Sequence, residues 1–212
     1  MTTDVKHAST ARHDDLHKGL RLEYFTLSWN VLEAAVGMAA GLAAGSVALI
    51  GFALDSVVEA SSATILVWRL HAEAHRGRPS EDVEQKAVRL VGVAFLLLAA
   101  YVGIRAGYDL LTQARPDESP YGIALALVSL VVMPVLAWRK RIVARRIDSR
   151  ALQADSKQTT LCTYLSGFLL LGLVANAAFG WWWADPVAGL AIAAFAAHEG
   201  RELLTTKDLC CP

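Results

Sequence analysis

Apolar blocks about as long as a membrane-spanning helix alternate with short polar stretches along this chain. A helix of roughly 20 apolar residues crosses the hydrocarbon of a bilayer. Charged residues gather between the blocks, where loops in water would lie. The pattern predicts an all-α, polytopic membrane protein with six transmembrane helices, approximately at residues 24–44, 45–68, 87–111, 121–138, 158–179 and 186–198.

These spans divide the chain into three segments. Residues 1–21 form a polar amino-terminal arm that holds no apolar core of a signal peptide. Residues 22–200 form the six-helix domain, and residues 201–212 form a short tail. The composition suggests no second, soluble domain.

The distribution of basic residues predicts the orientation of the helices. The arm, the tail and the loops after the second and fourth spans hold nearly all Lys and Arg. Because loops rich in Lys and Arg stay in the cytoplasm, both termini are expected on the cytoplasmic side. The membrane is expected to be the cell (inner) membrane. The basic run at 139–150 could also bind nucleic acid. A cytoplasmic loop explains it more simply, so no nucleic-acid partner is expected.

Composition agrees with a membrane protein. Hydrophobic residues make up 55% of the chain, against about 45–50% in soluble domains. The formal net charge is zero. Of the three cysteines, Cys162 lies in an apolar block and Cys210 and Cys211 lie at the end, so no disulfide framework is indicated.

The second span carries two carboxylates in its middle. Asp55 and Glu59 lie one helical turn apart on the same face, with no basic residue beside them. Ionisable side chains inside a membrane usually mark an ion path or a ligand site. A pair of protonated or hydrogen-bonded acids at a helix contact is the alternative. We favour a cation site, because one cation would stabilise both carboxylates; Glu33 in the first span either supports this path or satisfies a polar neighbour.

The start of the fifth span carries a second polar face. Asp155, Gln158 or Thr159, and Cys162 follow at i, i+3 or i+4, and i+7, which places them on one side of a helix. Carboxylate oxygen and thiolate sulfur both bind divalent metals. The second and fifth helices are therefore expected to bring ligand atoms to a similar depth.

Two segments resemble the cation diffusion facilitator family of metal transporters. They are GSVALIGFALDSVVEA at 45–60, and ADSKQTTLCTYLSG at 154–167 followed by WWWADPVAGLAIA at 181–193. The resemblance implies that Asp55 and Glu59 occupy the two ligand positions of the family's second helix. In the fifth helix the family has Asp, then His three residues later, then Asp four after that. Asp155 matches the first of these, while Gln158 stands in the His position and Cys162 in the second Asp position.

The resemblance has two further implications. The usual tetrahedral zinc set is not reproduced at Gln158 and Cys162, so Asp155 is a candidate to move in as a ligand. Family members commonly carry a cytosolic, dimer-forming domain after the sixth helix, and this chain resembles the short members that lack it. A homodimer is the family expectation. Cys210 and Cys211 either trap metal weakly or are incidental.

A secondary transporter is the function that these features favour. It would export a divalent transition metal from the cytosol while protons move the other way, because protons and metal compete for the same carboxylates. Cys162 favours zinc, and the carboxylates also admit manganese, iron or cobalt. The alternative is a non-transporting metal sensor or accessory subunit. No helical HExxH and no nucleophile elbow occurs, so neither an enzyme nor a resident cofactor is expected.

Small residues and caps indicate where helices pack and begin. Gly37, Gly41 and Gly45 repeat every four residues, a stripe that allows close helix contact either between two chains or within one. Asp185 directly before Pro186 has the pattern of an N-cap followed by proline at the first helical position. It is therefore predicted to cap the sixth helix.

Overall fold

The computed structural model describes residues 2–76, 81–147 and 149–205, and six long helices account for nearly all of them. Within these ranges there is no strand, as predicted. Cys210 and Cys211 lie outside the described residues. The helices are α1 (Thr2–Ala44), α2 (Val47–Arg76), α3 (Glu81–Thr112), α4 (Pro120–Ile147), α5 (Arg150–Phe179) and α6 (Ala184–Thr205).

Five of these helices are long and apolar enough to cross a membrane, judged over the described residues. The stretches are Asp15–Ala44, Val47–Trp68, Gly92–Thr112, Pro120–Ile147 and Asp155–Phe179. The apolar part of α6 is shorter, because Asp185 and Glu199 bound it. α6 still packs along α3 and against α2 and α5. The predicted polytopic helical architecture is thus confirmed.

The bundle exposes large apolar side chains and buries several charged ones within its mainly apolar interior. Large hydrophobic side chains such as Ile104, Leu111 and Tyr121 are among the most exposed residues. Charged side chains are buried instead, and they include Glu23, Glu33, Asp55, Glu59, Lys140, Asp155 and Asp185. A soluble protein has the opposite distribution, since Lys, Glu and Asp are almost never fully buried unless paired. The outer surface suits lipid, and the interior suits an ion.

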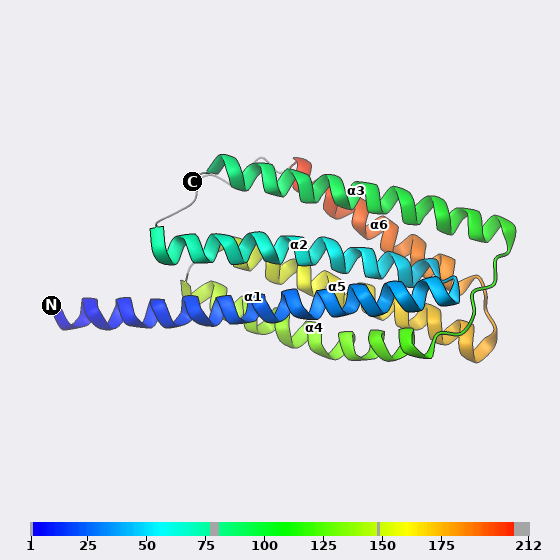
Figure 1. Cartoon of the computed structure of the whole chain (residues 1–212), viewed down its shortest axis with the longest axis horizontal. Coiled ribbons are helices and arrows are strands. Elements are labelled where there is room, and N and C mark those ends of the chain that lie inside the picture. Colours follow the sequence, from blue (N-terminus) through cyan, green and yellow to red (C-terminus); the bar gives the residue numbers. More distant parts are fainter. Residues whose placement is uncertain (1, 77–80, 148, 206–212) are drawn as a thin grey trace.

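α2 is the central helix of the bundle. It packs against α1, α3, α5 and α6. The α3–α6 pair lies on one side of it, and α1, α4 and α5 lie on the other (Figure 1). α1 begins and α6 ends at the same end of the bundle (Figure 1). The helix that carries Asp55 and Glu59 therefore has protein on most of its sides.

Each of the six helices extends beyond the span expected from hydropathy at one end or at both, as α1 and α4 illustrate. α1 begins at Thr2, so the amino-terminal arm continues the first span as helix. α4 continues to Ile147 through residues predicted to form a basic loop. The change from apolar to charged residues marks where lipid would end. It does not break the backbone hydrogen bonds of a helix, which depend on neither lipid nor water.

The glycine stripe packs inside one chain. A Cβ built on Gly37 would lie 3.1 Å from the Cβ of Ala53, and one on Gly41 would lie 2.9 Å from Cγ1 of Ile50. Both neighbours belong to α2, so these glycines allow α1 and α2 to approach closely. Gly45 has a different role, because it adopts a φ of 65° at the turn between the two helices.

Asp185 caps a different helix from the one predicted. It lies in the first turn of α6, and its carboxylate accepts hydrogen bonds at the start of α2. The donors are the Ser46 hydroxyl, the Val47 N–H at 3.0 Å and the Ala48 N–H at 3.4 Å. Ser46 in turn accepts from the Leu49 N–H at 3.1 Å. The orphan N–H groups and the positive end of α2 favour a carboxylate at this place.

Candidate cation site

Asp55 and Glu59 face the interior of the bundle from α2. Their side chains lie one turn apart, and the two residues are only 5% and 1% exposed. The Asp55 carboxylate makes no hydrogen bond or ion pair with any described residue, and Glu59 Oε2 likewise has no partner. Buried charges are normally paired or bound to metal. These two carboxylates are therefore suited to receive a cation.

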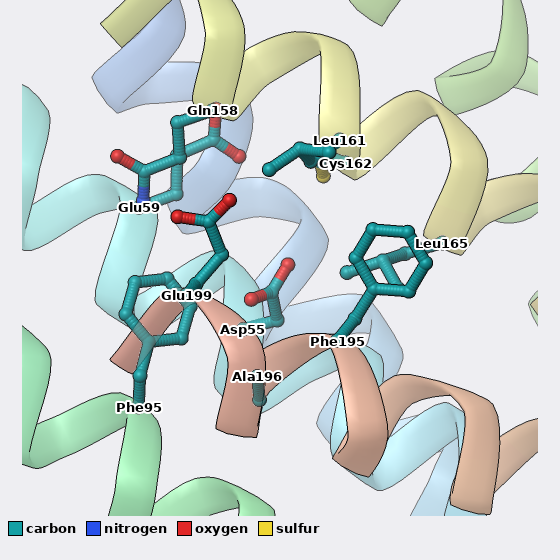
Figure 2. A pocket seen from close by; sticks show the side chains of 10 residues that line it. All are labelled: Asp55, Glu59, Phe95, Gln158, Leu161, Cys162, Leu165, Phe195, Ala196 and Glu199. Carbon is teal, nitrogen blue, oxygen red and sulfur yellow. The ribbon is translucent and has the colours of Figure 1, made fainter. Parts of the chain in front are cut away.

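A small cavity lies beside this pair, between α2, α3, α5 and α6. Its volume is about 20 Å³, which accommodates roughly one water molecule or one small ion. The polar residues around it are Asp55, Glu59, Gln158, Cys162 and Glu199, and the others are Phe95, Leu161, Leu165, Phe195 and Ala196 (Figure 2). The mixture offers oxygen and sulfur ligands within an apolar wall.

Four of the five candidate metal ligands meet at this cavity. Asp55 and Glu59 reach it from α2, and Gln158 and Cys162 reach it from α5. The agreement reflects helical geometry, since residues 158 and 162 are one turn apart. Of the alternatives at this turn, Gln158 lines the cavity, whereas Thr159 does not line it and contacts Glu59 instead.

Asp155 is separate from the other four candidates. Its carboxylate forms a buried ion pair with Lys140 of α4, and it does not line the cavity. The Lys140 ammonium is also 3.1 Å from Oε1 of Glu23. Lys140 and Glu23 have no exposed surface. We call Glu23, Lys140 and Asp155 the Lys140 cluster; it joins α1, α4 and α5 at one point.

Thr159 connects the Lys140 cluster to the candidate site. Its Oγ1 lies 3.4 Å from the Lys140 ammonium and 3.1 Å from Oε1 of Glu59. A hydroxyl can accept one hydrogen bond and donate another. The hydroxyl can therefore accept from Lys140 and donate to Glu59. The Asp155 carbonyl oxygen, also 3.1 Å away, is a second acceptor for the same hydroxyl hydrogen, so Thr159 lies between Glu59 and the Lys140 cluster.

A buried polar stripe on α1 continues this network. Glu23, Thr26, Asn30 and Glu33 follow at helical spacing, and none has exposed surface. The Ser56 hydroxyl donates to Oε2 of Glu33 at 3.4 Å. Glu33 therefore has a polar neighbour on α2, next to Asp55. Its other oxygen has no partner among the described residues.

Three participants were missed in the sequence. Glu23 lies just before the first expected span, and Lys140 lies within a basic run that the positive-inside rule explained. Glu199 follows the short apolar part of α6. The spacing of Glu23, Thr26, Asn30 and Glu33 on one helical face was the available signal, and it would have indicated a buried polar contact.

The candidate ligands lie too far apart, as they stand, to share a metal ion. Over the residues that the structure describes, no three His, Cys, Asp or Glu side chains are gathered closely enough to hold one. Side chains around the cavity must move together before they share an ion. The assignment of Asp55, Glu59, Asp155, Gln158 and Cys162 as metal ligands therefore remains a prediction.

The sequence matches a known domain over most of its length. The profile of the cation efflux transmembrane domain covers residues 24–207. The chain belongs to the cation efflux family. Family membership, the apolar outer surface and the five long apolar helices make it an integral membrane protein.

Individual relatives are similar at a moderate level. An uncharacterized transporter of Synechocystis sp. is 28% identical over 188 residues, which is 85% of this chain and 61% of the relative. Transmembrane protein 163 of Xenopus laevis is 26% identical over 88% of this chain and 66% of its own length. The cation-efflux pump FieF of Shewanella oneidensis is 28% identical over 63% and 43%. The chain spans less than two thirds of these relatives' lengths.

Proposed function

We propose that this protein is a secondary transporter that exports a divalent transition-metal cation across the inner cell membrane. Asp55 and Glu59 are the central ligands. Protons move in the opposite direction, and they bind the same carboxylates when the metal leaves. The name of the FieF relatives, cation-efflux pump, supports the direction of transport.

One observation carries this proposal. Asp55 and Glu59 are buried on the central helix of a lipid-facing bundle, and no basic residue among those that the structure describes lines the cavity beside them. Two adjacent carboxylates repel each other in a low dielectric unless a cation or protons neutralise them. A divalent cation neutralises both at once. The small cavity favours a single ion over an organic substrate.

The ligand types favour zinc within this class. Cys162 supplies sulfur beside the carboxylate oxygens, and softer ions prefer such mixed sites. Manganese, iron and cobalt remain accessible through the carboxylates. Gln158 contributes a neutral amide, which is a weak ligand. Comparing metals in one assay therefore belongs in any test of the proposal.

The transport test uses the purified chain in lipid vesicles that contain a metal-sensitive dye. Zinc, manganese and cobalt are added outside, with and without a proton gradient. The Asp55→Asn variant is expected to lose at least about tenfold in rate, because removing even an outer-shell partner of a metal costs 10–100-fold. Asp117→Asn is the matched control, since Asp117 is exposed between α3 and α4.

The outcomes separate the alternatives. Transport that depends on Asp55 and responds to the proton gradient supports the proposal. Metal binding without flux identifies a sensor or an accessory subunit instead. Full activity of Asp55→Asn would show that this carboxylate has a structural role.

Metal affinity is expected to fall as the pH falls. Carboxylate and thiolate ligands must lose their protons before they bind metal, so acid favours the metal-free state. Calorimetric titration of the detergent-solubilised protein with zinc at several pH values measures this. An affinity that does not change with pH argues against proton exchange at the same ligands.

A further inference from the structure

We infer that Glu199 of α6 is a third carboxylate ligand for the transported cation, so that α2, α5 and α6 assemble the site together. The inference rests on the proposed function and extends its ligand set. It assigns to α6 a role that spacing along the sequence did not indicate.

Glu199 projects into the cavity, unlike its acidic neighbour on α6. Figure 2 shows its carboxylate beside that of Asp55, on the side of the cavity opposite α5. Glu199 is partly buried and makes no hydrogen bond or ion pair with any described residue. Glu202, about one helical turn further along α6, is exposed, and its Oε2 lies 3.8 Å from Nε2 of His198. Only the first of these two acids reaches the candidate site.

The buried carboxylate of Asp55, beside Glu199, also lacks a compensating charge. Its side chain is 5% exposed, lines the same cavity and has no polar partner among the described residues. An isolated buried carboxylate is costly unless a cation or a proton compensates it. No described Lys, Arg or His lines this cavity. The compensating charge must therefore come from outside the protein.

α5 does not supply a negative charge to the cavity. Its only nearby carboxylate, Asp155, is occupied by the buried ammonium of Lys140. Gln158 and Cys162 are the α5 groups that remain at the cavity, and neither is a carboxylate. Without Glu199 the cation would have two carboxylates from one helix. With it, carboxylates approach from two separate helices and can close around the ion.

The carboxylates around the cavity are not gathered closely enough to share an ion as they stand, judged over the described residues. Like charges rest apart until a cation draws them together, so a three-carboxylate site is expected to contract on binding. Because α6 packs against both α2 and α3, movement of Glu199 towards the ion would displace α6 relative to its neighbours. Metal binding would then be linked to the packing of the α3–α6 pair.

The test measures zinc and cobalt binding to the full chain in detergent, by calorimetry and by the visible spectrum of bound cobalt. Glu199→Gln is expected to weaken binding about tenfold or more, which corresponds to about 1.4 kcal/mol or more. It should also change the cobalt spectrum, because one oxygen ligand is replaced. Glu202→Gln, an identical change at an exposed site on the same helix, should bind like the unaltered chain.

The possible results distinguish the role of Glu199 from the proposed function. Unchanged zinc affinity and cobalt spectrum in Glu199→Gln would overturn the role of Glu199, while the proposed function would stand if the unaltered chain binds. If the unaltered chain binds no metal at all, the proposed function itself fails. Should Glu199→Gln not fold, Glu199→Asp keeps the charge on a shorter side chain; a shifted cobalt spectrum then supports the inference, and an identical one refutes it.

Discussion

At the scale of single residues, the Lys140 cluster is a set of buried charged groups that lies outside the cavity and whose members compensate one another. One ammonium compensates the carboxylates of Glu23 and Asp155, and all three are buried. Removing one partner of such a pair destabilises the fold, because an unpaired buried charge costs far more free energy than a buried apolar side chain. The arrangement also holds the Asp155 carboxylate against Lys140, away from the cavity.

Replacing Lys140 with methionine is expected to destabilise the fold strongly. The change leaves two buried carboxylates without a cation, a defect that typically costs about 3–5 kcal/mol. Thermal unfolding in detergent measures the loss. Arg139→Met is the matched control, because Arg139 is next to Lys140 in the sequence but has an exposed side chain, which should tolerate the change.

A second measurement identifies the cause. Adding Glu23→Gln and Asp155→Asn to Lys140→Met removes both unpaired charges and should recover much of the lost stability. If Lys140→Met unfolds at the same temperature as Arg139→Met, the ion pairs contribute little to the fold.

At the scale of elements, glycines at close helix contacts and one capping carboxylate fix the position of α2 relative to α1 and α6. Gly37 and Gly41 bring α1 against α2, and Asp185 ties the start of α6 to the start of α2. α2 is thus fixed along one side and at one end. Its carboxylates keep their position relative to α5 and α6 because the helix that carries them is held in this way.

Gly41→Ala is expected to loosen the contact between α1 and α2. The new methyl group would lie 2.9 Å from Cγ1 and 3.0 Å from the backbone nitrogen of Ile50, and the backbone cannot easily yield. Elsewhere in a helix the same change usually stabilises by about 0.5–1 kcal/mol. Gly107→Ala is such a control, because nothing lies within 4 Å of a Cβ there.

Unfolding temperature and oligomer mass in detergent distinguish the two roles of the stripe. A lower unfolding temperature with unchanged mass indicates packing within one chain. A change in mass would show that the stripe also serves assembly, and the homodimer remains a prediction until then.

Asp185→Ala is expected to lower stability by about 0.5–2 kcal/mol, the usual cost of losing an N-cap. Its carboxylate accepts from Val47 and Ala48 at the start of α2. Asp185→Asn keeps an oxygen acceptor and should lose less. Thermal unfolding of both variants checks the order, and equal stability of the two would point to lost packing as the cause.

At the scale of the whole molecule, exposed apolar surface and buried charge together indicate a lipid environment. The first and last described helices begin and end on one side of the bundle (Figure 1). The positive-inside rule predicts that this side is cytoplasmic. The connection between α3 and α4 lies at the other end.

Cysteine labelling tests this orientation in intact cells. In a background whose native cysteines are replaced by serine, an impermeant maleimide should react with Glu118→Cys, since Glu118 is exposed between α3 and α4. Thr205→Cys at the end of α6 should react only after the membrane is opened. The reverse pattern would invert the topology and the expected direction of transport.

Local features of the chain were predicted correctly from sequence alone. The apolar blocks determine the helices, because hydrophobicity over about 20 residues is a property of one segment. The pairing of Asp55 with Glu59, and of Gln158 with Cys162, also follows from the helical repeat within a single element. These predictions required no knowledge of which helices become neighbours.

Contacts between distant segments were decided by the tertiary structure. Lys140 binds Glu23 across 117 positions, and Asp185 caps a helix that begins 138 positions earlier. A helical repeat shows which face a residue occupies but not which helix will cover that face. For this reason the sequence did not show that Asp155 pairs with Lys140, or that Glu199 lines the cavity. Only the packing of α1, α4 and α6 around α2 and α5 reveals their partners.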